Sequence, residues 1–303
     1  MQLGFVTAIL EDQPFEEVLR FAADEGFDCV EVLCWPPGGR DRKYGGVTNL
    51  DVSDFTQAAA DDARALSDKH GVAFSALSYY PNPLSANEEE ASVAREHLMK
   101  VIDAAALMGM QNVNTFVGAH HQKSIDENLA LFDEVWPPII AHAESRGVKI
   151  GIENCPMLWH DTWPTGSNIA RTPAIWRRMF EKVPSASFGL NYDPSHLRMQ
   201  LIAPVEPIHD FGDRIFHTHA KDMRVDTRRL NDVGSLALPM DRSTAKLPGL
   251  GDVDWGLWIG ALGDVGYDGP VCIEVEDEAY TGSLKARQRS LRISRDVLRP
   301  LIG

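Results

Sequence analysis

The segment Lys149-Ile150-Gly151-Ile152-Glu153-Asn154 contains the pattern from which the fold is predicted. Its apolar run follows a helical stretch that ends near Gly147, and an acidic residue closes it before a long stretch with Trp, His and Pro. A short apolar run between such boundaries is typical of a buried strand in a parallel sheet. The same order of helix, glycine, strand and loop recurs along the chain, so we expect a series of βα units.

Eight segments follow this pattern. They are residues 3–7, 29–33, 73–78, 112–116, 149–153, 187–192, 215–220 and 271–275. Eight parallel strands are the number that closes a (β/α)8 barrel, and 303 residues suit one such domain. An open doubly wound sheet is the alternative, but no G-x-G-x-x-G motif follows the first segment. We therefore predict an α/β fold, a single TIM-barrel domain over residues 1–303.

The connections between these segments are unequal in length. A glycine stands just before several of the strands, as expected for short turns from a helix into a strand. These glycines are Gly26, Gly71, Gly109, Gly147 and Gly266. The stretches that follow strands two, five and seven are long, and the longest are 35–51, 154–173 and 224–252. Because TIM-barrel enzymes build their active sites from these loops, we expect the site at that end of the barrel.

Composition restricts the classes of partner. The chain has 44 acidic and 29 basic residues, a formal net charge of −15, and this charge repels nucleic acid and anionic membranes. No apolar stretch reaches the length of a membrane span, and no signal peptide is recognised, so we expect a cytoplasmic protein. The four cysteines, Cys29, Cys34, Cys155 and Cys272, lack the spacing of a metal motif and are expected to be reduced thiols.

Four successive strands, the fifth to the eighth, end in or near a residue that suits a metal ion. These residues are Glu153, Asp193, His219 and Glu274. Three carboxylates that converge on one barrel mouth would repel one another unless a cation neutralised them. An oxygen-rich set with one imidazole favours Mn²⁺, with Co²⁺ or Mg²⁺ as alternatives, over a tetrahedral structural zinc. We therefore predict a site for one divalent metal ion.

The chain resembles the sugar isomerase and epimerase superfamily with the xylose isomerase-like TIM barrel, which includes ketose 3-epimerases, inosose isomerases and dehydratases, and endonuclease IV. The motifs that support the resemblance are Ile152-Glu153-Asn154, Asp193-Pro194-Ser195-His196, His217-Thr218-His219-Ala220-Lys221-Asp222 and Pro248-Gly249-Leu250-Gly251-Asp252. The resemblance implies that the four residues above bind the metal and that His196 and Arg224 contact the substrate. It also implies that Glu153 and Glu274 lie on opposite faces of the substrate and carry its proton.

Several further residues have two open interpretations. Glu31 in the second strand could reach the substrate or anchor a loop, and His120 after the fourth strand could be an extra acid or base or a solvated histidine. Lys221 and Asp222 could form an internal ion pair or take part in catalysis. Five aromatic residues could line a sugar pocket or pack against the rim of the barrel. They are Trp35, Tyr79, Tyr80, Trp159 and Trp163.

The expected reaction is isomerisation or epimerisation of a ketose, an inosose or another keto-sugar through a metal-stabilised cis-enediolate. A lyase that eliminates a β-oxygen substituent from an inosose or a 3-keto glycoside is the first alternative, because the same intermediate leads to it. An endonuclease IV-like phosphodiesterase is disfavoured, since the histidines of its additional metal ions have no counterparts after strands three and seven. A barrel that has lost catalysis and serves as a binding subunit is a further alternative. The expected partner is a small carbohydrate, and a homo-oligomer or a partner subunit stays open.

The segment 224–248 is the longest polar insertion of the predicted mouth. It contains Gly234 and Pro239, and it begins soon after the predicted metal ligand His219. We expect it to close over the bound substrate or to contribute to a subunit interface. A solvated insertion without a role is the alternative.

Overall fold

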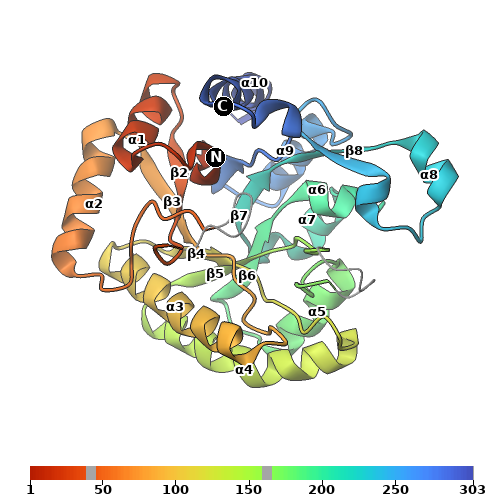
Figure 1. The fold of residues 1–303 in the computed structure, drawn as a ribbon, viewed down its shortest axis with the longest axis horizontal. Coiled ribbons are helices and arrows are strands. Elements are labelled where there is room, and N and C mark those ends of the chain that lie inside the picture. Colours follow the sequence, from red (N-terminus) through yellow and green to blue (C-terminus); the bar gives the residue numbers. More distant parts are fainter. Residues whose placement is uncertain (39–45, 159–165, 303) are drawn as a thin grey trace.

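The computed structural model describes residues 1–38, 46–158 and 166–302, and eight parallel strands form its centre. The strands close into a barrel in the order β1-β10-β7-β6-β5-β4-β3-β2 (Figure 1). They are β1 (Gln2–Val6), β2 (Cys29–Leu33), β3 (Ala73–Ser78), β4 (Asn112–Thr115), β5 (Lys149–Glu153), β6 (Phe188–Tyr192), β7 (Ile215–Ala220) and β10 (Pro270–Ile273). The predicted TIM barrel is confirmed, and the bounds of β2, β3, β5 and β7 agree with the prediction.

The other strand bounds differ from the prediction at their ends. The eighth barrel strand was expected over 271–275, but its ladder with β7 stops at Ile273, which pairs with Ala220. Glu274 therefore lies one residue beyond the strand, and its backbone N–H still donates to the carbonyl of Ala220. This position places the Glu274 side chain at the mouth of the barrel rather than within the sheet.

Helices surround the barrel, as Figure 1 shows. The α-helices are α1 (Phe15–Asp24), α2 (Gln57–His70), α3 (Glu88–Leu107), α4 (Ile125–Ser145), α5 (Pro173–Lys182), α6 (Pro194–Arg198), α7 (Glu206–Phe211), α8 (Thr227–Val233), α9 (Trp255–Asp264) and α10 (Leu284–Ile302). Short 3-10 helices are η1 (Thr7–Leu10), η2 (Gly212–Arg214), η3 (Pro239–Asp241) and η4 (Glu278–Tyr280). No helix of the described ranges is both long and apolar enough to cross a bilayer.

Local sequence signals explain where several helices begin and end. Ser124 and Glu127 form a reciprocal capping box at the start of α4, which satisfies backbone N–H groups that the helix leaves free. Gly71 ends α2 with a positive φ of 66°. Glycine adopts this left-handed conformation without strain because it has no Cβ atom. The other four predicted turn glycines also have positive φ values. These short turns lie at the end of the barrel opposite the predicted mouth.

Two apolar regions pack against the strands. Residues that point outward, such as Val30 and Val32 of β2, belong to the large core between barrel and helices. The alternate residues Cys29 and Leu33 point inward and belong to a small interior cluster with Cys272. Much of the remaining interior is polar and fully buried, and it includes Glu31. Since buried polar groups need partners, we expect hydrogen bonds and ion pairs, as well as apolar packing, inside this barrel.

The segment predicted as a long loop over 224–248 contains regular structure. Strands β8 (Asp222–Val225) and β9 (Ser243–Lys246) pair as an antiparallel hairpin, which is separate from the barrel sheet. Helix α8 and the 3-10 helix η3 lie between the two strands and project from the barrel, at the right of Figure 1. The hairpin forms because the two polar strands satisfy each other's backbone groups.

Candidate functional site

The four predicted metal ligands lie at one end of the barrel. Glu153 is the last residue of β5, Asp193 directly follows β6, His219 lies near the end of β7 and Glu274 directly follows β10. The Nδ1 atom of His219 is 3.7 Å from Glu153 Oε1 and 3.4 Å from Glu274 Oε2. These side chains form one buried group, which we call the carboxylate cage: Glu153, Asp193, His219 and Glu274.

His196 lies directly beside two carboxylates of the cage. Its Nε2 atom is 3.0 Å from Glu153 Oε1 and 3.4 Å from Asp193 Oδ2. Donor atoms of Glu153, Asp193, His196 and Glu274 all lie within 4.8 Å of one another, so His196 is itself a candidate ligand. The short helix α6 begins at Pro194 and is capped by the Asp193 side chain, and this tight turn directs His196 back over the cage.

The Lys221 side chain extends into the cage and is 1% exposed. Its Nζ atom is 2.6 Å from Glu274 Oε2 and 3.3 Å from both Asp193 Oδ2 and Glu276 Oε2. An ammonium among carboxylates supplies part of the positive charge that the cage requires. Lys221 therefore belongs to the candidate site by its contacts.

Of the two interpretations left open for Lys221 and Asp222, the ion pair between them is not formed. Asp222 instead accepts hydrogen bonds from the backbone N–H groups of Gly249, Gly251 and Val253 and from the indole of Trp255. Neighbouring residues in an extended segment point to opposite sides, which separates the two side chains. Asp222 thus fixes the turn after the hairpin, while Lys221 faces the cage.

Burial and charge act in opposite directions on the pKa values of the cage. Burial alone raises the pKa of the Glu153 carboxyl, but hydrogen bonds from His196 and His219 outweigh it and hold this pKa well below its usual value. Burial lowers the pKa of the Lys221 ammonium, but Glu274 and Glu276 outweigh it and raise the pKa well above the usual value. In both cases the charged form is stabilised by its neighbours rather than by water.

Glu31 orients His219 from below the cage. Its Oε2 atom accepts a hydrogen bond from His219 Nε2 at 2.7 Å, and its Oε1 atom accepts one from the Tyr80 hydroxyl. Asn191 Nδ2 donates to Tyr80 at 3.1 Å. Burial raises the pKa of the Glu31 carboxyl, but the imidazoles of His219 and His217 outweigh it and lower this pKa to about 2. An ionised carboxylate behind a metal-facing histidine is a common way to set its orientation.

The cage residues suit a divalent ion. Because Glu31 can only accept, His219 Nε2 carries a proton, and Nδ1 is the nitrogen that faces Glu153 and Glu274. Burial lowers the pKa of the His219 imidazole, but Glu31 and Glu274 outweigh it and raise this pKa well above its usual value, so Nδ1 holds a proton that a metal ion would displace. Buried Asp193 Oδ2 lacks a hydrogen-bond partner of acceptable geometry, although Lys221 Nζ lies near it, and such an acceptor is costly without a cation. The described residues therefore offer ligands for a metal ion with a mixed oxygen and nitrogen set.

Two predicted substrate contacts lie outside the cage. Arg224 is exposed on β8 and donates to the carbonyl of Leu250. His120 is half-buried after β4, and its backbone is held by hydrogen bonds with Asn128. Within the described ranges, neither side chain forms a hydrogen bond or an ion pair with a cage residue. Their role toward a substrate stays a prediction.

The predicted aromatic residues divide between different positions. Tyr80 is at the cage, where its ring lies 6.2 Å from that of His219. Trp35 and Tyr79 pack edge to face at 4.9 Å, a rim contact rather than a stack open to a ligand. Trp159 and Trp163 lie outside the described residues. The four cysteines are free thiols, as predicted.

Comparisons with known proteins agree with this architecture. A family model described as a xylose isomerase-like TIM barrel matches residues 19–301. The uncharacterized protein YfiH of Bacillus subtilis (strain 168) is 28% identical over 91% of this chain and 93% of its own length. The inosose dehydratase of Geobacillus thermodenitrificans (strain NG80-2) is 24% identical over 66% of this chain and 68% of its own. The solved IOLI protein with a binding zinc atom has a TM-score of 0.72 at 18% identity over 99% of both chains, which demonstrates a shared fold.

Proposed function

Since the chain belongs to the xylose isomerase-like TIM barrel family, we propose that it is a metal-dependent isomerase or epimerase of a ketose, an inosose or another keto-sugar. The observation that carries the proposal is the pair Glu153 and Glu274, which approach the same His219 nitrogen from different strands at the barrel mouth. One carboxylate can remove the proton next to a carbonyl, and the other can return it from the opposite side.

A divalent ion would be held by Glu153, Asp193, His219 and Glu274, with His196 as a further candidate ligand. Such an ion supplies positive charge that stabilises the enediolate anion of the substrate. The three carboxylates carry three negative charges, which two charges of the ion and one of Lys221 balance. Lys221 therefore supports the proposal, because a cage that is neutral overall tolerates burial.

We propose Mn²⁺ as the ion, with Co²⁺ or Mg²⁺ as alternatives, because carboxylate oxygens dominate the ligand set. The test is to remove metal with a chelator and to restore it with single ions. Mn²⁺ or Co²⁺ should restore more turnover than Zn²⁺. Full turnover in a demonstrably metal-free sample would contradict the metal-dependent reaction.

Elimination of water is the second candidate, and Glu276 is the observation that favours it. Its Oε2 atom lies 3.3 Å from Lys221 Nζ, beside Glu274. Burial raises the pKa of the Glu276 carboxyl more than Lys221 lowers it, so this carboxyl keeps its proton to a higher pH than an ordinary glutamate does. A protonated carboxyl could give its proton to a departing hydroxyl, which leaves as water after another carboxylate has taken the carbon-bound proton. The similarity to a protein named inosose dehydratase also supports this candidate.

The two candidates differ in their products. The metal-loaded protein should be incubated with ketohexoses, inososes and 3-keto glycosides, and the products identified by NMR. An epimer or an isomer supports the first proposal, whereas an unsaturated ketone and loss of water or of the glycosidic substituent support the second. Absence of both kinds of product across this panel would count against the proposed substrate class.

A further inference from the structure

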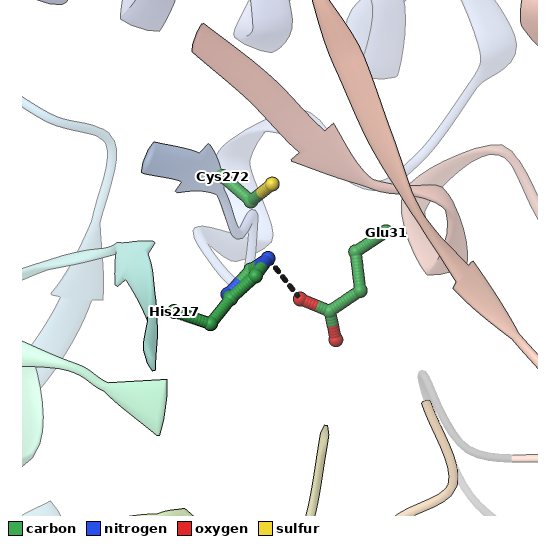
Figure 2. A group of neighbouring side chains, drawn as sticks. All are labelled: Glu31, His217 and Cys272. Carbon is green, nitrogen blue, oxygen red and sulfur yellow. Dashed lines mark ion pairs between the residues drawn. The ribbon is translucent and has the colours of Figure 1, made fainter. Parts of the chain in front are cut away.

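A second group of potential ligands lies deeper in the barrel, below the carboxylate cage. His217 lies two residues before His219 on β7, and Cys272 lies two residues before Glu274 at the end of β10. Glu31 from β2 completes the group, which we call the inner cluster: Glu31, His217 and Cys272. All three side chains are fully buried, and Figure 2 shows them converging from three different strands.

The donor atoms of the inner cluster are close enough to share one ion. One donor atom from each residue lies within 4.8 Å of the other two. Ser75 lies between two of them, because its hydroxyl is 3.0 Å from His217 Nε2 and 3.4 Å from Cys272 Sγ. A serine oxygen or a water could therefore complete a four-coordinate arrangement.

Hydrogen bonds around His217 direct a lone pair into the inner cluster. The Nδ1 atom lies 3.0 Å from Asn191 Oδ1, and since an amide oxygen only accepts, Nδ1 carries the proton. The unprotonated Nε2 then faces Glu31 Oε2 at 3.6 Å, visible as the dashed line in Figure 2. In the metal-free protein the Ser75 hydroxyl can donate to this Nε2 at 3.0 Å, and a bound cation would replace that hydrogen bond and bridge the imidazole to the Glu31 carboxylate.

Space beside the thiol is provided by Gly4 of β1. A Cβ atom at this position would lie 2.6 Å from Cys29 Sγ and 3.0 Å from Cys272 Sγ, so only glycine fits between the two sulfurs. The missing side chain leaves room between the Cys29 and Cys272 thiols, beside the inner cluster.

We propose that Glu31, His217 and Cys272 form a second metal site, which takes Zn²⁺ and is distinct from the carboxylate cage. A thiolate, an imidazole and a carboxylate are all ligands that zinc prefers, whereas the cage is dominated by oxygen. Binding would release the thiol proton of Cys272 to solvent. One thiolate and one carboxylate then balance the two charges of the ion, as a fully buried site requires.

The test counts metal ions and asks which thiol binds them. Metal-free protein is loaded with Zn²⁺, excess ion is removed, and bound zinc is measured by mass spectrometry. We expect two equivalents in the unaltered protein and in Cys34→Ala, a control that removes another buried thiol. We expect one equivalent in Cys272→Ala and in His217→Gln. The cage variant Glu153→Gln should lose the other equivalent, which separates this site from the proposed function.

Cobalt supplies an independent readout. A thiolate ligand gives Co²⁺ a near-ultraviolet charge-transfer band, which should be present in the unaltered protein and absent in Cys272→Ala and Cys272→Ser. Cys155 belongs to another potential ligand group at the mouth, with Glu153 and His196, so Cys155→Ala is measured in parallel. The proposal is overturned if the unaltered protein holds a single zinc equivalent or shows no thiolate band. Loss of the band in Cys155→Ala alone would likewise overturn it.

Discussion

Replacement of Lys221 by Met should make the protein depend on metal for its stability. The ammonium lies 2.6 Å from Glu274 and 3.3 Å from Asp193, and it is 1% exposed. Met preserves much of the length of the side chain but removes its charge. Without metal, the cage carboxylates would then be buried with the histidines as their remaining cationic neighbours.

The size of the effect follows from the burial of this pair. Removal of one partner from a buried ion pair costs about 3–5 kcal/mol, because the other charge is left uncompensated. For a domain of this size, such a loss lowers Tm by roughly 10 °C. A divalent ion restores the missing positive charge. After loading with Mn²⁺, the variant should therefore show less than half of the stability loss that it shows without metal. Mn²⁺ should also bind the variant about tenfold more tightly or better, since a nearby cation no longer opposes it.

The assay is thermal and urea unfolding of both proteins with chelator and with Mn²⁺, together with a Mn²⁺ titration. Lys246→Met is the matched control, because Lys246 pairs with Asp277 at 3.1 Å on the hairpin and not in the cage. The change in stability caused by Lys246→Met should be the same with and without Mn²⁺. If metal-free Lys221→Met is as stable as the unaltered protein, Lys221 does not compensate the cage and this reasoning fails.

Three further predictions follow from the same geometry. Glu153→Gln and Glu274→Gln should each abolish turnover and keep the circular dichroism spectrum of the fold; unfolding of both variants would instead indicate structural roles. The pKa of the Glu31 carboxyl is lowered to about 2 in the folded protein. The ionised carboxylate therefore adds about 3 kcal/mol to the free energy of unfolding above the usual pKa near 4.5, and this stabilisation is lost as the pH falls toward 2. Metal-free Glu31→Gln should therefore lose less stability between pH 5 and pH 3 than the unaltered protein, as measured by urea unfolding; equal slopes would refute this. Deletion of residues 227–241, which removes the exposed Leu236, should reduce turnover or change the oligomeric state seen by light scattering. Unchanged values of both would leave the hairpin tip without a role.

The barrel was predictable because its signals are local. Five of the eight barrel strands are short runs that follow a glycine turn, and the strand over Lys149–Glu153 was predicted with its observed bounds. The carboxylate cage was predictable for a related reason. Residues at the carboxyl ends of successive barrel strands must meet at one mouth, so strand order alone brings Glu153 and Glu274 together.

Other features of the site depend on where side chains point and on how segments pair, which the sequence pattern does not specify. The role of Lys221 follows from the side of the chain on which it lies, which separates it from Asp222 and points it toward Glu274. The hairpin of β8 and β9 was missed because both strands are short and largely polar and pair across an intervening helix. His196 reaches the cage only because α6 begins at Pro194, a tertiary detail that its spacing from Asp193 did not determine.

Proton exchange at carbon tests the central claim most directly. The metal-loaded protein is incubated in D₂O with each keto-sugar of the panel, and deuterium at the carbon next to the carbonyl is followed by NMR. For the true substrate, exchange or deuterated product should form with metal present and stop in chelator and in Glu153→Gln and Glu274→Gln. Conversion of a keto-sugar to an epimer or isomer with no solvent deuterium at that carbon, or exchange that persists without metal and without both glutamates, would contradict the account.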